Sequence, residues 1–252
     1  MFSYVEYKEI IRNIKATGLY CDYAKALTRG RFIIMRHDVE YSVERAHSLS
    51  RVEDSLDFTA NYFFQWTNNS YNILSRCNMD MVKDMNERGH NIGLHFALNG
   101  LTDIEQIRKQ ITKEMDTLSE MFGFEMRQFS IHRPSKAILK ANLKFSDIIN
   151  AYQDEFFTFS ENAAVDPQIK IKYLSDSNHI WRYGYPDAET LKSHDKIQIL
   201  THPFGWTKPG YDNFDNFKTL VREKHLEVIN SIHNECKDFG EYRDYFIKKA
   251  ED

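Results

Sequence analysis

Two patterns of apolar residues alternate along this chain. In one, apolar residues recur three and four positions apart, as in amphipathic helices, and in the other they form short runs, as in buried strands. The first pattern predicts helices over residues 3–17, 42–56, 78–88, 103–121, 135–141, 187–194 and 213–248. The second predicts strands over residues 31–38, 58–64, 90–95, 127–131 and 196–201. Strands that alternate with helices indicate an α/β fold with a parallel sheet and right-handed crossovers.

Single residues mark where several of these elements begin and end. Gly18 predicts the end of the first helix, and Ser42 is the expected N-cap of the second. Thr102 is the expected cap of the long central helix, and Gly240 is expected to divide the last helical segment. These signals support the element boundaries.

Two stretches are less regular than the rest. Residues 169–174 alternate apolar and polar side chains, which predicts a half-exposed strand at the edge of the sheet. Residues 145–165 follow neither pattern, and we expect them to form a loop over the site.

Ionisable residues follow the first apolar strand, where packing gives them no role. Because side chains alternate along a strand, Arg36, Asp38 and Glu40 are expected on one face and His37 on the other. Two carboxylates and a guanidinium on one face suit a metal site or an acid–base site. A buried structural ion pair between Arg36 and Asp38 is the alternative interpretation.

Histidines end three further apolar strands, namely His95, His132 and His202. The carboxyl ends of parallel strands meet at one end of a β/α barrel, where active sites are built, so these side chains are expected to converge. The carboxylate of Asp38 and the imidazole of His95 form a pairing that suits a divalent metal. His37 and His90 lie on the opposite faces of their strands and are expected to be structural.

The last of these histidines is a candidate proton donor. His202 precedes an aromatic segment that contains Trp206. A histidine here can protonate a leaving group when a nearby acid sets its pKa. Asp176 is the expected acid, and Trp181 the expected apolar wall.

Composition narrows the class of protein. The chain has 252 residues, is 42% hydrophobic and carries a net charge of -4, which suits one globular domain and gives no basic surface for nucleic acid. Three scattered cysteines, Cys21, Cys77 and Cys236, favour a reducing compartment. The N-terminus does not resemble a signal peptide, and no apolar run is long enough for a transmembrane segment. We therefore expect a cytoplasmic protein.

Six strings in order carry a resemblance to a known family. They are Arg36-His37-Asp38-Val39-Glu40, residues 60–64, residues 89–95, His132-Arg133-Pro134-Ser135, Ser175-Asp176-Ser177 with Trp181, and Thr201-His202-Pro203. Together they resemble the polysaccharide deacetylase (NodB-homology) superfamily of carbohydrate esterases over roughly residues 30–206. The resemblance extends to its divergent WbmS-like branch, which is found among surface-polysaccharide (O-antigen or capsule) biosynthesis proteins.

The resemblance implies a distorted (β/α)7 barrel and a divalent ion, expected to be Zn²⁺, held by one aspartate and two histidines. It implies one domain over residues 1–252, with helical extensions at residues 1–29 and 207–252. Two positions depart from the family pattern: Val39 follows Asp38 where a second aspartate is usual, and Asn99 stands where a second histidine is usual. Glu40 can replace the missing carboxylate, and His132 is the expected third ligand.

Carried over by position, the resemblance assigns a role to each candidate. The expected metal ligands are Asp38, His95 and His132, and the expected catalytic residues are Asp38, Glu40, Arg133 and His202. The expected substrate-binding residues are Arg36, Asp176, Trp181 and Trp206.

The expected function is metal-dependent hydrolysis of an N-acetyl amide or an ester on a sugar, a C–N bond outside peptides in the amide case. The partner is then a carbohydrate, namely a nucleotide sugar, a lipid-linked glycan or an oligosaccharide. Two alternatives stay open. One is an enzyme on the same fold that forms an amide or modifies a polysaccharide in another way. The other is a non-catalytic sugar-binding module with a degenerate metal site.

Overall fold

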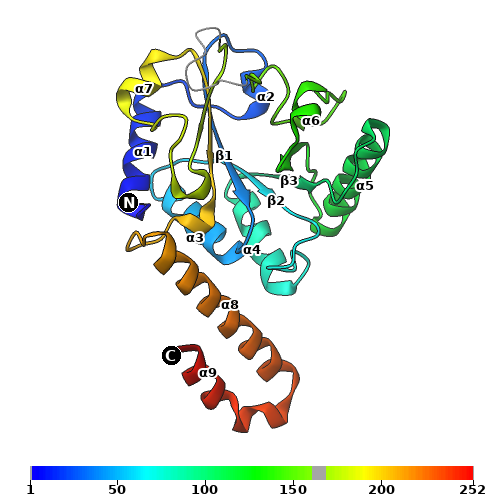
Figure 1. The fold of residues 1–252 in the computed structure, drawn as a ribbon, viewed down its shortest axis with the longest axis vertical. Helices are drawn as coiled ribbons and strands as arrows, with labels where there is room; N and C mark the ends of the chain where they lie inside the picture. Colours follow the sequence, from blue (N-terminus) through cyan, green and yellow to red (C-terminus); the bar gives the residue numbers. More distant parts are fainter. Residues whose placement is uncertain (1, 161–168, 252) are drawn as a thin grey trace.

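A single parallel sheet organises the chain, as the computed structural model shows for the residues that it describes, 2–160 and 169–251. Within them, seven strands pair in the order β5-β4-β3-β2-β1-β7-β6, and every pair is parallel. Their bounds are β1 Phe32–Val39, β2 Asn61–Phe64, β3 Asn91–Ala97, β4 Gln128–His132, β5 Ile149–Asn150, β6 Lys172–Ser175 and β7 Lys196–Thr201. The strands form a curled sheet, an incomplete barrel that is open between its end strands β5 and β6. The predicted distorted (β/α)7 barrel is therefore confirmed (Figure 1).

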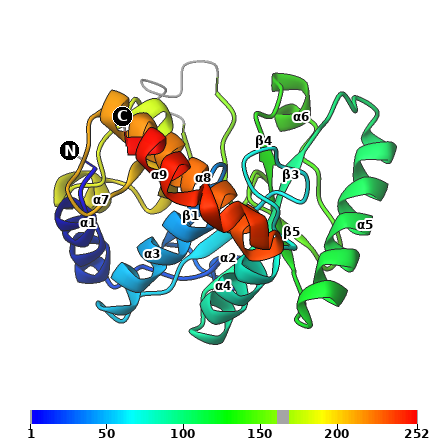
Figure 2. The same cartoon turned by 90° about the horizontal axis from the view of Figure 1, so that it is seen from below.

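Helices cover the outer face of this curled sheet. Viewed from below, α1, α3, α4 and α5 lie around the outside of the strands (Figure 2). The helices are α1 Tyr4–Thr17, α2 Tyr23–Ala26, α3 Val43–Asp54, α4 Arg76–Glu87, α5 Ile104–Phe122, α6 Lys136–Lys140, α7 Ala188–Ser193, α8 Asn213–Glu235 and α9 Arg243–Glu251. Helix α8 extends away from the sheet, and α9 folds back against α8 (Figure 1). None of the described helices is long and apolar enough to cross a bilayer.

The structure confirms most of the predicted elements. Gly18 ends α1 in the left-handed conformation at φ 68°, and the Ser42 side chain caps α3. The predicted edge strand is β6, which lies at one end of the sheet. The predicted cap of α5 was wrong: Asp103, not Thr102, accepts the hydrogen bond from the backbone of Gln106. A carboxylate one residue later competes well for the same N–H groups.

Two short elements were missed, α2 and β5, because four and two residues are too few to show a period. The expected loop at 145–165 contains β5 and turns over residues 145–160. Residues 161–165 lie outside the described residues. The expected extensions contain α1 and α2 at one end and α8 and α9 at the other, and the single domain stays a prediction.

Alternation along β1 separates two buried layers. Phe32 and Ile34 face the interior of the barrel, where Phe63 and Phe156 also pack. Ile33, Met35 and Val39 face the helices, in the larger apolar cluster that includes side chains of α1, α3, α4 and α5. The polar residues at the end of β1 alternate in the same way. Their side chains therefore lie in two different environments, the interior of the barrel and the layer that faces the helices.

Candidate metal and acid–base site

The interior face of β1 ends in a buried ion pair. The Arg36 guanidinium donates two hydrogen bonds to Asp38, from Nε to Oδ1 at 2.9 Å and from Nη2 to Oδ2 at 2.7 Å. The two side chains are 0% and 4% exposed. The guanidinium also lies over the Tyr152 ring, 4.3 Å from its centroid. Burial would raise the pKa of Asp38, but the adjacent Arg36 cation outweighs it and holds that pKa well below its usual range.

A chain of hydrogen bonds connects this ion pair to His95 on β3. The Ser130 hydroxyl donates to Asp38 Oδ1 at 3.1 Å, and His95 Nδ1 lies 2.7 Å from the same hydroxyl. Because the hydroxyl hydrogen goes to Asp38, its oxygen accepts from Nδ1–H of His95. Burial lowers the pKa of His95 to about 4, so the ring is neutral and Nε2 carries a lone pair. The network thus fixes the tautomer that a metal ligand needs.

That lone pair faces two further potential ligands. His95 Nε2 lies 3.1 Å from His132 Nδ1, and His132 Nδ1 lies 3.2 Å from Glu40 Oε1. The three ligand atoms all lie within 4.8 Å of one another. Two imidazole nitrogens and one carboxylate oxygen form the donor set of catalytic zinc sites, which keep a further position open. The residues present therefore fit a divalent ion, and we call Glu40, His95 and His132 the ligand cluster.

Asp38 lies behind this cluster and is not part of it. Its Oδ2 is 3.7 Å from His95 Nδ1, the ring nitrogen that points away from His132. Both of its oxygens already accept from Arg36. The structure therefore places Glu40, which follows the last residue of β1, where Asp38 was expected as a ligand.

An acid–imidazole pair stands after β6 and β7. His202 Nδ1 lies 2.7 Å from Asp176 Oδ1, and the Trp206 indole N–H donates to Asp176 Oδ2 at 2.8 Å. The backbone N–H of His202 also donates to Asp176. Burial lowers the pKa of His202, but the Asp176 carboxylate outweighs it and raises that pKa to about 9. At neutral pH the imidazole is therefore charged, and its Nε2 has no hydrogen-bond partner among the described residues.

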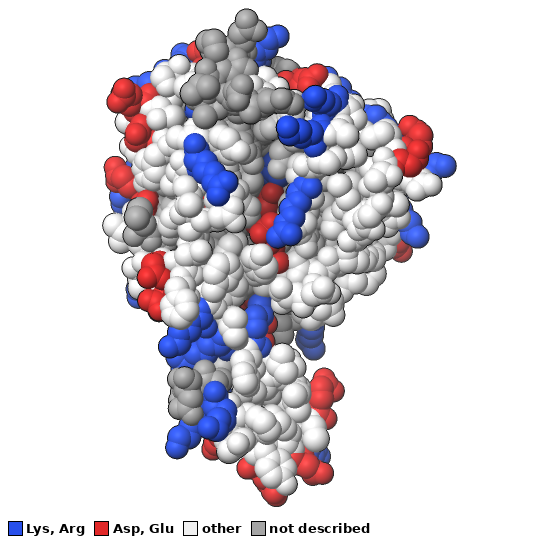
Figure 3. Space-filling view, in the orientation of Figure 1, with Lys and Arg blue, Asp and Glu red and all other residues white. Residues whose placement is uncertain are grey.

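Residues of the ligand cluster and of the acid–imidazole pair line one pocket of about 320 Å³. Asp38, Glu40, His95 and His202 line it together with Arg133, and aromatic side chains supply much of the remaining wall. In the space-filling view, acidic atoms are visible in a hollow that basic side chains flank (Figure 3). A pocket of this size, with converging polar groups and shifted pKa values, has the properties of an active site.

The four expected substrate-binding residues are not among the side chains that line this pocket. Arg36, Asp176 and Trp206 are buried, and each is bonded to another protein group. Trp181 is half-buried and packs between Trp206 and Tyr185, away from the pocket. Arg36 holds Asp38, Asp176 holds His202, and Trp206 holds Asp176, so three of the four fix side chains that line the pocket or their partners.

Two residues singled out in the sequence, Arg133 and Asn99, are exposed. Arg133 lines the pocket and adopts a left-handed backbone at φ 47°, which Pro134 follows. It makes no ion pair within the described part of the chain. Asn99 also has a positive φ, of 47°, and its amide donates to Thr67 Oγ1 at 3.3 Å. Asn99 is thus not a member of the ligand cluster.

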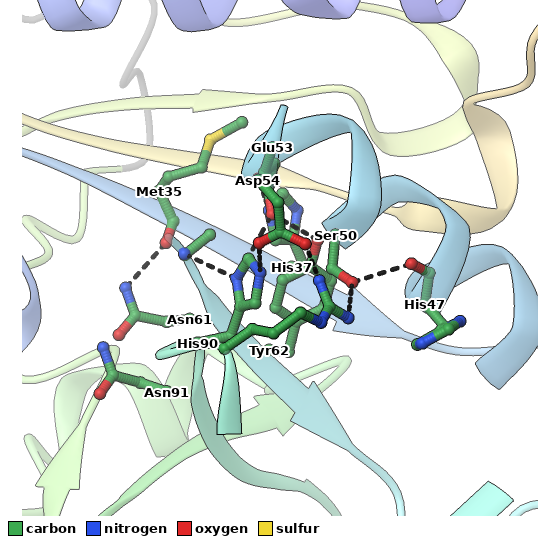
Figure 4. A network of polar contacts seen from close by, with 12 residues as sticks. Met35, His37, His47, Ser50, Glu53, Asp54, Asn61, Tyr62, His90 and Asn91 are labelled. Carbon is green, nitrogen blue, oxygen red and sulfur yellow. Dashed lines mark hydrogen bonds and ion pairs between the residues drawn. The ribbon is translucent and has the colours of Figure 1, made fainter. Parts of the chain in front are cut away.

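The outer face of β1 holds a second buried polar network, which the sequence predicted only in part (Figure 4). Glu53 of α3 is fully buried and accepts hydrogen bonds from Tyr7 and Tyr62, each at 2.6 Å, and from His37 Nε2 at 2.9 Å. His37 Nδ1 lies 2.6 Å from Thr201 Oγ1. Glu53 was missed, although it occupies a core position of its helix, seven residues after Ala46.

His90 belongs to this outer network, as its strand position predicted. Its Nδ1 accepts from the backbone N–H of Ala60 at 3.1 Å, and its Nε2 donates to Asp54 Oδ1 at 3.1 Å. Burial lowers the pKa of His90 to about 4. His37 and His90 are therefore neighbours of the sheet's outer core and not of the pocket.

Comparison with known proteins adds structural likenesses at low identity. No protein-family model matches the chain, and no curated protein matches it by sequence. A chitin deacetylase from the fungal pathogen Colletotrichum lindemuthianum is similar at 16% identity and a TM-score of 0.45, over 78% of this chain and 84% of that one. A family 4 carbohydrate esterase from Bacillus anthracis is similar at 15% identity and a TM-score of 0.42, over 86% and 85%.

A CE4 family pseudoenzyme from Bacillus anthracis is also similar, at 12% identity and a TM-score of 0.44. The similarity covers 79% of this chain and 62% of the pseudoenzyme. The strand order described above, and not these likenesses, establishes the fold.

Proposed function

We propose that this protein is a metal-dependent hydrolase that removes an acetyl group from an N-acetylated, or an esterified, sugar. The observation that carries the proposal is the convergence of Glu40, His95 and His132 in the neighbourhood of a charged imidazole, His202. A donor set of two imidazole nitrogens and one carboxylate oxygen next to a proton donor suits hydrolysis of an amide.

Glu40, His95 and His132 would hold the ion. A divalent ion bound there lowers the pKa of a bound water and polarises the acyl carbonyl. His95 is ready for ligation because Ser130 and Asp38 fix its tautomer. Arg36 keeps Asp38 ionised and in place, so the ion pair acts as a support and Asp38 is a positioning residue.

The chain's own residues would move the protons. Glu40 is ionised, because the neighbouring histidines keep the pKa of its carboxyl below the usual value despite its burial, and its carboxylate oxygen that does not hold the ion would accept the proton of the attacking water. Water adds to the acyl carbon, and His202 Nε2 gives its proton to the amine nitrogen as the C–N bond breaks. The products are acetate and an amino sugar. Arg133, exposed at the pocket edge and unpaired within the described residues, is free to bind the substrate.

Asp176 prepares His202 for this step. It accepts from Nδ1 and from the backbone N–H of His202, which orients the ring and keeps it charged. Trp206 in turn holds the second oxygen of Asp176. Both are positioning residues, since neither reaches the pocket.

Finer features of the proposal come from the sequence resemblance. We propose zinc as the ion and surface-polysaccharide biosynthesis, as in the WbmS-like group, as the process. The substrate is then a nucleotide sugar, a lipid-linked glycan or an oligosaccharide. The three cysteines, all among the described residues, form no disulfide, which favours a reducing compartment such as the cytoplasm.

Acetate release from a panel of N-acetylated and O-acetylated sugars tests the proposal. The zinc-loaded protein should release acetate, and His95→Ala should lose more than about a thousandfold of kcat, as for other essential site residues. His225→Ala, which alters an exposed histidine of α8, is the matched control. Acetate release that survives His95→Ala contradicts the proposal. Formation of a new amide bond on the sugar would instead favour the amide-forming alternative. Sugar binding without turnover would favour the non-catalytic alternative.

A further inference from the structure

Helices α8 and α9 form an arm that the barrel supports at one end. Two ion pairs tie the first half of α8 to α3. Arg45 bonds to Glu223 at 2.7 Å, and Glu44 bonds to Lys224 at 3.4 Å. Beyond these ion pairs α8 leaves the barrel, and α9 packs mainly against α8 and the turn between them (Figure 1). We call this segment, residues 213–251, the arm.

An apolar face runs along α8 on the outside of the molecule. It consists of five side chains that are between 41% and 77% exposed, namely Phe214, Phe217, Val221, Val228 and Ile232. Spacings of three, four and seven residues place them on one side of the helix, and we call them the α8 stripe. Two other apolar side chains of α8, Leu220 and Ile229, are buried. Helix α8 is therefore apolar beyond the surface that its own chain covers, which indicates a further partner.

The α8 stripe is symmetric about its own midpoint, which lies between positions 224 and 225. Val221 and Val228 are equally far from this midpoint, and the same holds for Phe217 and Ile232. In a two-fold dimer of antiparallel helices, each residue meets the residue at the same distance on the other side of the midpoint. Two copies of α8 would therefore pair valine with valine near the centre and phenylalanine with isoleucine on either side.

The charges of the arm also favour a second copy. The lysine near the midpoint, Lys224, is bonded to Glu44 and to Glu227, at 3.4 and 2.8 Å, which holds its charge at the side of α8 that meets α3. Along α8 and α9, lysine and arginine are mixed with aspartate and glutamate, without the cationic face of helices that bind anionic membranes. Uncharged side chains cover much of the visible face of the arm (Figure 3).

The area of the α8 stripe suits a dimer interface. From their exposures, the five side chains present roughly 500 Å² of apolar surface on each copy. Two copies would thus cover about 1,000 Å² in total, the size at which specific interfaces begin.

We propose that this protein forms a two-fold symmetric dimer in solution, in which the α8 stripes of two copies pack antiparallel. The contact is isologous, so the same surface serves both copies and the assembly closes at two. Each Val221 packs against Val228 of the second copy, and each Phe217 packs against Ile232 of the second copy. The arm is then the dimerisation element of the chain.

Sedimentation velocity of the full chain tests the dimer. The wild-type protein should sediment as a dimer at micromolar concentration. Val228→Glu places a carboxylate in the apolar contact of both copies, so it should weaken the dimer by at least about a hundredfold. Val5→Glu, at a valine of α1 that is 75% exposed, is the matched control and should stay dimeric. Circular dichroism should show the same helix content in all three proteins.

Cysteine substitutions test the antiparallel register. The background is Cys77→Ser with Cys236→Ser, which removes the two exposed thiols. Positions 221 and 228 of one chain are about 10 Å apart along α8, and in the antiparallel dimer each position is as far from its own copy, beyond the reach of a disulfide. Val221→Cys or Val228→Cys alone should therefore give no covalent dimer under oxidising conditions, whereas the two together should give one on a non-reducing gel.

Other outcomes overturn the inference. They are a monomeric wild type, a dimer that Val228→Glu leaves intact, and a covalent dimer from either single cysteine. A monomer that binds phosphatidylglycerol vesicles would assign the α8 stripe to a membrane instead. None of these measurements involves acetate release, so the proposed function is tested separately.

Discussion

The two faces of β1 carry polar groups that are equally buried but differently satisfied. On the outer face, Glu53 receives hydrogen bonds from two tyrosines and a histidine, and none of these side chains lines the catalytic pocket. On the inner face, Arg36 and Asp38 are paired, but the chain continues through Ser130 and His95 to atoms that line an open space. The outer network is closed, because its polar atoms bond to one another. The inner network ends at ligand atoms that face the pocket.

The difference shows which buried titratable groups indicate a function. Glu53, His37 and His90 have the composition of an active site, but their polar atoms are used by the protein itself. The ligand cluster has the same residue types, but the ring nitrogens and carboxylate oxygen face one another. Burial alone therefore does not separate the two regions, whereas open donor positions do.

The largest effect is expected from a substitution that breaks the closed network on the outer face of β1. Glu53→Ala leaves two tyrosine hydroxyls and His37 without their acceptor, so the free energy of unfolding should fall by about 3–5 kcal/mol. Zinc affinity of the folded fraction should stay unchanged, because Glu53 does not contact the ligand cluster. Urea unfolding and a zinc titration measure the two quantities.

Glu40→Ala is the matched variant on the inner face. It should abolish zinc binding and change the free energy of unfolding by no more than about 1 kcal/mol, since Glu40 sits at the pocket wall. If Glu53→Ala abolishes zinc binding as well, or if Glu40→Ala unfolds the protein, the two networks do not have separate roles.

Asp176→Asn should shift the pH dependence of kcat. The wild-type alkaline limb is expected near pH 9, because His202 must be protonated to donate and its pKa is raised to about 9. Removing the carboxylate lowers this pKa toward or below its ordinary value of 6.5, so the limb should move down by about two pH units. A pH profile of acetate release measures the shift.

Trp206→Phe provides the control for that shift. It removes the hydrogen bond to the second oxygen of Asp176 but keeps the carboxylate, so a smaller shift is expected. An unchanged alkaline limb in Asp176→Asn would show that His202 is not the proton donor.

Ser130→Ala should weaken zinc binding without abolishing it. It interrupts the connection between Asp38 and His95, and such losses behind a metal ligand usually weaken metal affinity by about 10- to 100-fold. Ser146→Ala, on an exposed turn, is the matched control. Competition with a chromogenic zinc chelator measures the affinity, and an unaffected value would mean that Ser130 does not orient His95.

The sequence predicted the strands and the convergence of their histidines because both follow from short-range patterns. Apolar runs located β1, β3 and β7, and the rule that parallel strands end on one side placed His95 and His132 together. Alternation also put Arg36 and Asp38 on one face, where they are found paired.

The identity of the ligands depends on contacts that no local pattern contains. Nothing in the sequence shows that Arg36 takes both oxygens of Asp38, or that Glu40 turns back toward His132 after β1 has ended. The burial of Trp206 likewise depends on α1, whose Tyr7 packs edge-on against its ring at 5.0 Å. The helix period of α3, by contrast, carried an unused signal for Glu53.

A crystal structure of the zinc-soaked protein, with anomalous scattering recorded at the zinc edge, tests the central claim most directly. We expect one ion bonded to Glu40, His95 Nε2 and His132 Nδ1, at about 2.0–2.2 Å, with Asp38 still paired to Arg36. An ion bonded to Asp38 in place of Glu40, or zinc absent from this cluster at saturating concentration, would contradict it.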